Sequence, residues 1–178
     1  MKTYLGTVMF FTLTLLMCAS TCHTNQKNGV VRRYHKNGKV LAEITYKNGK
    51  KHGPFKSWYD NGQLHEQAHF ENDSVVGHST AYYKNGKKNS EDNRSKNHKL
   101  HGVSLFWYEN GVLGDSGRYE NGKFAGEWKR YYENGQLEHI RNYSNGKLDG
   151  KSIYFKENGD TLKVQLHRNG ELIEFKDY

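Results

Sequence analysis

The chain is rich in side chains that could carry out acid–base or metal chemistry, but their spacing does not assemble a site. It holds ten histidines and 19 acidic residues, and no nucleophile, base and acid come together outside a repeated pattern. On an extended strand the Cα atoms of His65 and His69 would lie about 13 Å apart, too far to share one ion. His98 and His101 could meet in a loop, yet a third ligand is missing, and His101, like His52, simply precedes a repeated glycine. We therefore expect no catalytic residues, no metal site and no cofactor.

The strongest pattern in the chain is instead a regular series of Asn-Gly pairs. Asn72-Asp73 and Asn97-His98 fill two gaps, successive pairs are 11 to 13 residues apart, and two steps make a repeat of 24 residues. A type I′ turn needs two residues at positive φ, and Asn-Gly between alternating residues is the strongest short-range hairpin signal. We therefore expect turns at each pair. The pairs begin at Asn37, Asn48, Asn61, Asn85, Asn110, Asn121, Asn134, Asn145, Asn158 and Asn169, so that Asn61-Gly62, Asn110-Gly111 and Asn134-Gly135 are predicted structural turns.

Columns of aromatic residues and of glycine recur in register with these turns. An aromatic residue always stands three positions before the first Asn of a repeat, and mostly apolar residues stand three positions after it, which predicts cross-strand pairs. A second set of rings follows the first by one position, so alternation places it on the opposite sheet face. A glycine column is predicted to close wider loops on the edge opposite the tight turns. The first rings include Trp58, Tyr82, Trp107 and Tyr131, the second are Tyr59, Tyr83, Tyr108 and Tyr132, and the glycines are Gly53, Gly77, Gly102, Gly126 and Gly150.

The composition favours a thin sheet over a globule with a thick core. Hydrophobic residues make up only 34% of the 178 residues, the mean hydropathy is −0.99, and aromatic residues account for 13%. The buried layer must therefore consist mainly of rings and the stems of long side chains. We predict an all-β fold, an elongated single-layer antiparallel meander of about six 24-residue β-hairpin repeats.

At this point the motifs resemble a known family. The pattern Gly-x-x-x-x-aromatic-Tyr-x-Asn-Gly-x-Leu, followed by aromatic-x-Asn-Gly-Lys-x-x-Gly, is similar to the MORN repeat variant common in bacterial proteins, and residues 126–150 are close to an ideal copy. The resemblance covers residues 34 to about 174. It implies an elongated β-sheet that mediates contacts, and bacterial relatives often carry a toxin–antitoxin label. The sequence departs from the pattern at Asn72-Asp73 and over residues 87–99, where a loose or bulged segment is expected.

The first 22 residues differ from the rest and resemble a secretory leader. Lys2 is followed by a charge-free run from Tyr4 to Thr21, and both cysteines, Cys18 and Cys22, lie at its end. Each cysteine is a candidate for lipidation, because the segment resembles a bacterial lipoprotein signal. Ordinary cleavage nearby, a membrane-spanning anchor and a disulfide between the two cysteines are the alternatives. The predicted organisation is a signal peptide at 1–22, a polar tether at 23–33 and a repeat array at 34–178.

The charge of the chain points to anionic partners. Its formal net charge of +8 falls to +7 without Lys2. An exported protein does not meet cytosolic nucleic acid, so we do not expect nucleic acid as a partner, and anionic envelope polymers or lipid headgroups suit the surface better. A solvated face that discourages aggregation is the alternative explanation for the basic residues.

Three functions follow from the sequence, from three different classes. We favour a non-catalytic scaffold in the cell envelope that binds a protein or an anionic polymer through the ring columns. The alternatives are an antitoxin-like inhibitor that binds a partner toxin and, least favoured, a hydrolase. A monomer or an edge-paired oligomer is expected.

Overall fold

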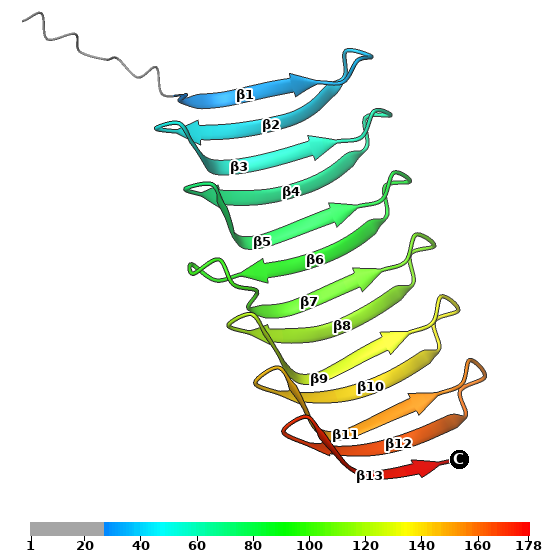
Figure 1. Cartoon of the computed structure of the whole chain (residues 1–178). Coiled ribbons are helices and arrows are strands. Elements are labelled where there is room, and N and C mark those ends of the chain that lie inside the picture. The colour runs from blue at the N-terminus through cyan, green and yellow to red at the C-terminus, as the bar shows by residue number, and fades with distance from the viewer. Residues whose placement is uncertain (1–26) are drawn as a thin grey trace, which may run out of the picture.

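The computed structural model describes residues 27–178, which form one open antiparallel sheet (Figure 1). The 13 strands follow one another in chain order, so the predicted all-β single-layer meander is confirmed. The predicted signal peptide at 1–22, with Cys18 and Cys22, lies outside the described residues. Among residues 27–178 no helix is long and apolar enough to cross a membrane. The strands are β1 (Gly29–Tyr34), β2 (Val40–Lys47), β3 (Lys50–Trp58), β4 (Leu64–Glu71), β5 (Ser74–Tyr82), β6 (Lys88–Arg94), β7 (Gly102–Trp107), β8 (Leu113–Glu120), β9 (Lys123–Tyr131), β10 (Leu137–Ser144), β11 (Lys147–Phe155), β12 (Thr161–Arg168) and β13 (Glu171–Asp177).

The array begins earlier than the sequence indicated. Residues 29–33, predicted as part of a polar tether, belong to β1 and pair with β2, with Val31 opposite Ile44. The prediction is therefore wrong for these residues. Val30 and Val31 are β-branched and favour a strand, and pairing with β2 satisfies the backbone groups of β1 that face that strand.

The second Asn-Gly of each repeat forms the expected tight turn. Asn145 and Gly146 have φ values of 51° and 84°, and the same signs recur at the equivalent pairs that begin at Asn48, Asn121 and Asn169. Two successive residues at positive φ define the type I′ turn, so the prediction is confirmed here. Asn72 and Asp73 form the same turn, with φ values of 48° and 69°, although the glycine is missing.

The first Asn-Gly of each repeat forms a wider turn, and here the type I′ prediction is wrong. At Asn61-Gly62 only the glycine has positive φ. The Tyr59 amide donates to Gln63 O, the Gly62 amide donates to Tyr59 O, and the Gln63 amide donates to the Asn61 side chain. Asn61 therefore contributes its side-chain acceptor rather than a left-handed backbone, as Asn and Asp do in Asx turns.

The glycine column lies within strands and not in the wider loops that were predicted. Gly53, Gly126 and Gly150 sit inside β3, β9 and β11 at positive φ, where the register with the preceding strand shifts. Such shifts are β-bulges, which often place a glycine in the left-handed region. A bulge bends the strand and raises its twist, so this column curves the sheet instead of ending its strands.

The polar stretch at 87–99, where a loose or bulged segment was expected, is loose on one side only. Residues 88–94 form β6 and pair along their whole length with β5. On the other side, only Ser90 and Glu91 pair with β7, besides one isolated bridge from Arg94 to Leu100. The intervening turn has the hydrogen bonds of the wide turns, with His98 at φ 61° in the position that glycine fills elsewhere.

The sheet has almost no interior, because nothing covers either face in the described part of the chain. The only hydrophobic side chains that are buried there are those of Ala42, Ile44 and Val76. Contacts between successive turns replace a core: the stems of Lys99 and Lys123 lie 3.6 and 3.4 Å from where a Cβ would stand on the glycine of the next turn, Gly122 or Gly146. Long side chains that cover the neighbouring turn supply apolar contact while their charged ends stay in water.

We predict that His98→Gly stabilises the array. A non-glycine residue in the left-handed region is strained by about 1–2 kcal/mol, and the exposed His98 ring makes no contact that offsets this strain. The midpoint of chemical denaturation should rise by an amount equivalent to about 1 kcal/mol. Asn97→Gly is the control, because Asn97 is not at positive φ and should gain nothing. A lower midpoint for His98→Gly would contradict the strain argument.

Candidate functional site

The first ring column forms a stripe across one face of the sheet, which we call the stripe face. The predicted cross-strand pairs are present, with Trp58 opposite Leu64, Trp107 opposite Leu113 and Tyr131 opposite Leu137. The rings of the column are half-buried from Trp58 to Phe155, and Lys88 lies over the Trp107 ring at 5.4 Å. Trp58 also borders a shallow hollow with Val40 and Glu43. The stripe is therefore partly open to a partner.

The second ring column holds the repeats together at the wide turns. The hydroxyl of Tyr108 donates to the carbonyl of Tyr131, one repeat further on, at 2.8 Å. Tyr59, Tyr83 and Tyr132 make the same bond to Tyr82, Trp107 and Phe155. The side chains of Asn37, Asn61, Asn85 and Asn110 form a parallel ladder to the next turn. Of the two predicted columns, this one is structural.

We predict that Tyr108→Phe weakens the array by about 1 kcal/mol, because it removes one net hydrogen bond between neighbouring repeats. Tyr34→Phe is the matched control, since the Tyr34 side chain is 58% exposed at the start of the array. Denaturation monitored by circular dichroism should show a lower midpoint for Tyr108→Phe alone. Equal midpoints for both variants would show that the ladder contributes nothing to stability.

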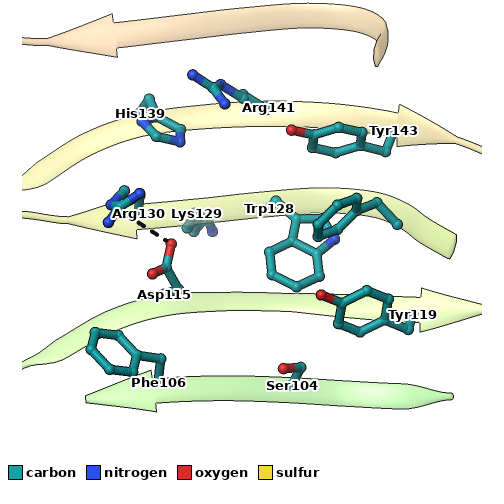
Figure 2. A pocket seen from close by; sticks show the side chains of 11 residues that line it. Ser104, Phe106, Asp115, Tyr119, Trp128, Lys129, Arg130, His139, Arg141 and Tyr143 are labelled. Atoms are coloured by element: carbon teal, nitrogen blue, oxygen red, sulfur yellow. Dashed lines mark ion pairs between the residues drawn. The ribbon is translucent and has the colours of Figure 1, made fainter. Parts of the chain in front are cut away.

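The opposite face carries a shallow depression of about 350 Å³ over β7 to β10, which we call the basin (Figure 2). Charged side chains, Asp115 and Arg130, lie toward one end, and rings, Tyr119, Trp128 and Tyr143, lie toward the other. The phenol oxygens of Tyr119 and Tyr143 point toward the middle. The basin therefore joins an aromatic wall to a charged wall within the size range of small-ligand sites.

Glycines allow the aromatic wall to lie flat on the sheet. A Cβ on Gly117 would stand 2.0 Å from the Trp128 ring, so only glycine fits beneath the indole. The indole N–H donates to the carbonyl of Arg118 at 3.0 Å, which fixes the ring over β8. Phe124 packs against Trp128 edge to face and stacks on Tyr119, and it remains 37% exposed. These contacts preorganise the wall.

The charged wall is largely neutralised around Arg130. Its Nε lies 3.9 Å from Asp115 and 3.3 Å from Glu138, and the nearby negative charge of Asp115 raises the pKa of Arg130. Arg130 and its carboxylates therefore form a small ion-pair network within the wall. Such networks fix side-chain geometry more than they stabilise the fold.

His139 lies between this network and Arg141 and is held neutral. Burial lowers the pKa of His139, and the charge of Arg141 lowers it further. Glu138, with a carboxylate oxygen 3.3 Å from Nδ1, opposes both effects without overcoming them. His139 is only 9% exposed, and its ring lies 5.6 Å from that of Tyr154. It could accept or donate one hydrogen bond at neutral pH, but no nucleophile stands beside it in the basin.

We predict that His139 makes the array less stable in mild acid. Because the pKa is lower in the folded state, the unfolded state binds protons more readily below about pH 6.5. The free energy of unfolding should fall as the pH drops through and below this value, and it should depend less on pH in His139→Gln. His101→Gln, which removes an exposed imidazole, serves as the control and should keep the dependence. Identical pH profiles for His139→Gln and the wild type would refute this role.

The histidines singled out in the sequence take structural positions. His65 lies 3.3 Å from the Ser57 hydroxyl and packs on the Tyr59 ring, and His101 accepts a bond from the Asn121 amide. Within residues 27–178, no three His, Cys, Asp or Glu side chains are placed to hold a metal ion.

Sequence reasoning missed the basin, although its residues left a signal. Trp128 is the only tryptophan in a column that elsewhere holds Phe55, Ser79, Ser104 and Ser152. Arg141 is the only basic residue in a column that elsewhere holds Ile44, Ala68, Asp92, Gly117 and Gln165. Departures from the repeat, and not the repeat itself, mark this site. Gly114 and Gly117, which lie outside the regular glycine column, were a second signal because each accommodates a ring.

Comparison with known proteins bears on the repeats alone. The family model described as MORN repeat variant matches residues 27–48, 51–72, 100–113 and 125–145. The irregular stretch at 87–99 falls between matched segments. No curated protein matches the chain.

Proposed function

Because the chain belongs to the MORN repeat variant family, whose repeats commonly serve as binding or scaffold modules, we propose that it is a non-catalytic scaffold in the cell envelope. Its partner is a protein or an anionic envelope polymer or lipid headgroup. The observation that carries the proposal is the uncovered sheet: the stripe and the basin present rings on both faces, beside basic side chains. A rigid array with open faces can hold a partner without moving.

Charge supports an anionic partner. The described residues carry 26 basic and 19 acidic side chains, a net charge of +7, since Lys2 is the only charged residue among the first 26. Such a surface attracts polyanions and anionic headgroups, and the attraction weakens with added salt. The catalytic alternative lacks support, because the basin offers no nucleophile beside His139.

The envelope location rests on the predicted leader and its cysteines. We expect expression in a diderm bacterium to yield a cleaved, lipid-modified species in the membrane fraction, detected by intact mass. This species should be lost in either Cys18→Ser or Cys22→Ser, and the other variant serves as the matched control. An uncleaved species in the soluble fraction would contradict an envelope location. The binding role is tested separately by the titrations of anionic ligands described for Arg141.

A further inference from the structure

Arg141, on β10 at the β11 side of the basin, is a cation without a compensating charge (Figure 2). None of the ion pairs among residues 27–178 includes it, whereas Arg130 on the neighbouring strand has two carboxylates. Its Nε is buried and has no hydrogen-bond partner there. A buried donor without an acceptor is unfavourable, so Arg141 does not occupy this position for stability alone. Its uncompensated charge lines the basin, which suits Arg141 to bind an anion there.

The surroundings of Arg141 keep it charged and hold it in place. Burial alone would lower the pKa of Arg141, but the phenols of Tyr143 and Tyr154 outweigh burial and raise it. The guanidinium carbon lies 5.3 Å from the centre of the Tyr154 ring. The residues paired with Arg141 are Trp128 on β9 and Ser152 on β11, and the hydroxyl of Ser152 is also buried without a partner. The cation therefore adjoins the aromatic wall.

We propose that Arg141, Trp128 and Tyr143 form a binding site for the carboxylated sugar rings of an acidic polysaccharide. This inference rests on the proposed scaffold function and names the ligand class of its basin. The guanidinium would bind the sugar carboxylate in a charge-assisted hydrogen bond. The electron-rich faces of the aromatic wall would stack on the weakly positive C–H groups of the sugar ring.

The rest of the basin favours a sugar acid over other anions. Asp115 and the phenols of Tyr119 and Tyr143 line it, and these oxygens can bond to sugar hydroxyls. A carboxylate such as Asp115 would repel a phosphate or a second acidic group placed beside it. A polymer of acidic amino acids such as polyglutamate carries carboxylates but neither rings to stack nor hydroxyls for Asp115. The shallow shape lets a polymer pass through the site instead of ending in it.

The test uses the full chain as recovered from cells and three probes. Oligogalacturonate carries rings and carboxylates, its methyl ester carries the same rings without charge, and polyglutamate carries carboxylates without sugar rings. Binding is measured by calorimetry and by the shift of the Trp128 indole N–H signal. Oligogalacturonate should bind, the methyl ester should bind at least about tenfold more weakly, and Arg141→Gln should weaken oligogalacturonate binding by about tenfold or more.

Matched variants separate a specific site from general attraction. Arg118→Gln removes the same charge from the stripe side of β8 and should leave affinity nearly unchanged. Arg141→Gln should fold, because Gln165 occupies the equivalent position on β12, and a denaturation midpoint no lower than that of the wild type checks this. If Arg141→Gln bound oligogalacturonate as tightly as the wild type does, or if polyglutamate bound instead, the sugar-acid site would be overturned. The proposed scaffold function would not be affected by either result. Failure of all three probes would overturn the sugar-acid site and remove the support for an anionic polymer as the partner.

Discussion

The whole structure depends on contact between each repeat and the next. A single-layer sheet cannot bury side chains on both faces, and here only Ala42, Ile44 and Val76 form apolar buried positions among the described residues. Stability must then come from backbone ladders and from side chains that reach one repeat further, as the Tyr108 hydroxyl does to Tyr131. In such arrays the free energy of folding is approximately a sum of repeat and nearest-neighbour terms. The tyrosines, asparagines and lysines of the turns supply the neighbour terms.

Because the contacts between repeats lie at the turns, the two faces of the sheet are available for binding. The groups that join repeats are concentrated at the turns, and the side chains in the middle of the strands are not all needed for cohesion. The Trp128 ring needs only the space left by the missing Cβ of Gly117 on the neighbouring strand, so this part of the basin involves two adjacent strands. A regular array can therefore acquire a local site without altering the fold.

How much the sequence could reveal follows from the same distinction. The Asn-Gly series determined the meander and the pairs Trp58–Leu64 and Tyr131–Leu137, because register follows from turn spacing and side-chain alternation. It did not separate the two turn types, because Asn61 and Asn145 have the same neighbour but use different atoms of the asparagine. The sequence also led to a wrong placement of the glycine column, since a glycine in a β-bulge and a glycine in a loop cannot be told apart by spacing alone. The basin was not predicted, because its lining comes from β7 to β10 and forms one site only when these strands lie side by side, although Trp128 and Arg141 depart from the repeat.

The unsatisfied groups around Arg141 make sense in an array of this kind. The buried Nε of Arg141 and the buried hydroxyl of Ser152 have no partners, and each destabilises the fold by roughly 1–3 kcal/mol. In a small globular protein this loss would weaken the single cooperative core. In a repeat array the loss is confined to the contacts of β9 to β11, while the hydrogen bonds of Tyr108 and Tyr132 at the turn edge hold the same repeats in register. Because the hydrogen bonds at the turns stabilise these repeats, the uncompensated charge of Arg141 can be tolerated in the middle of β10. Burial and the charge of Arg141 lower the pKa of His139 and keep it neutral, so the basin presents one uncompensated cation and not two.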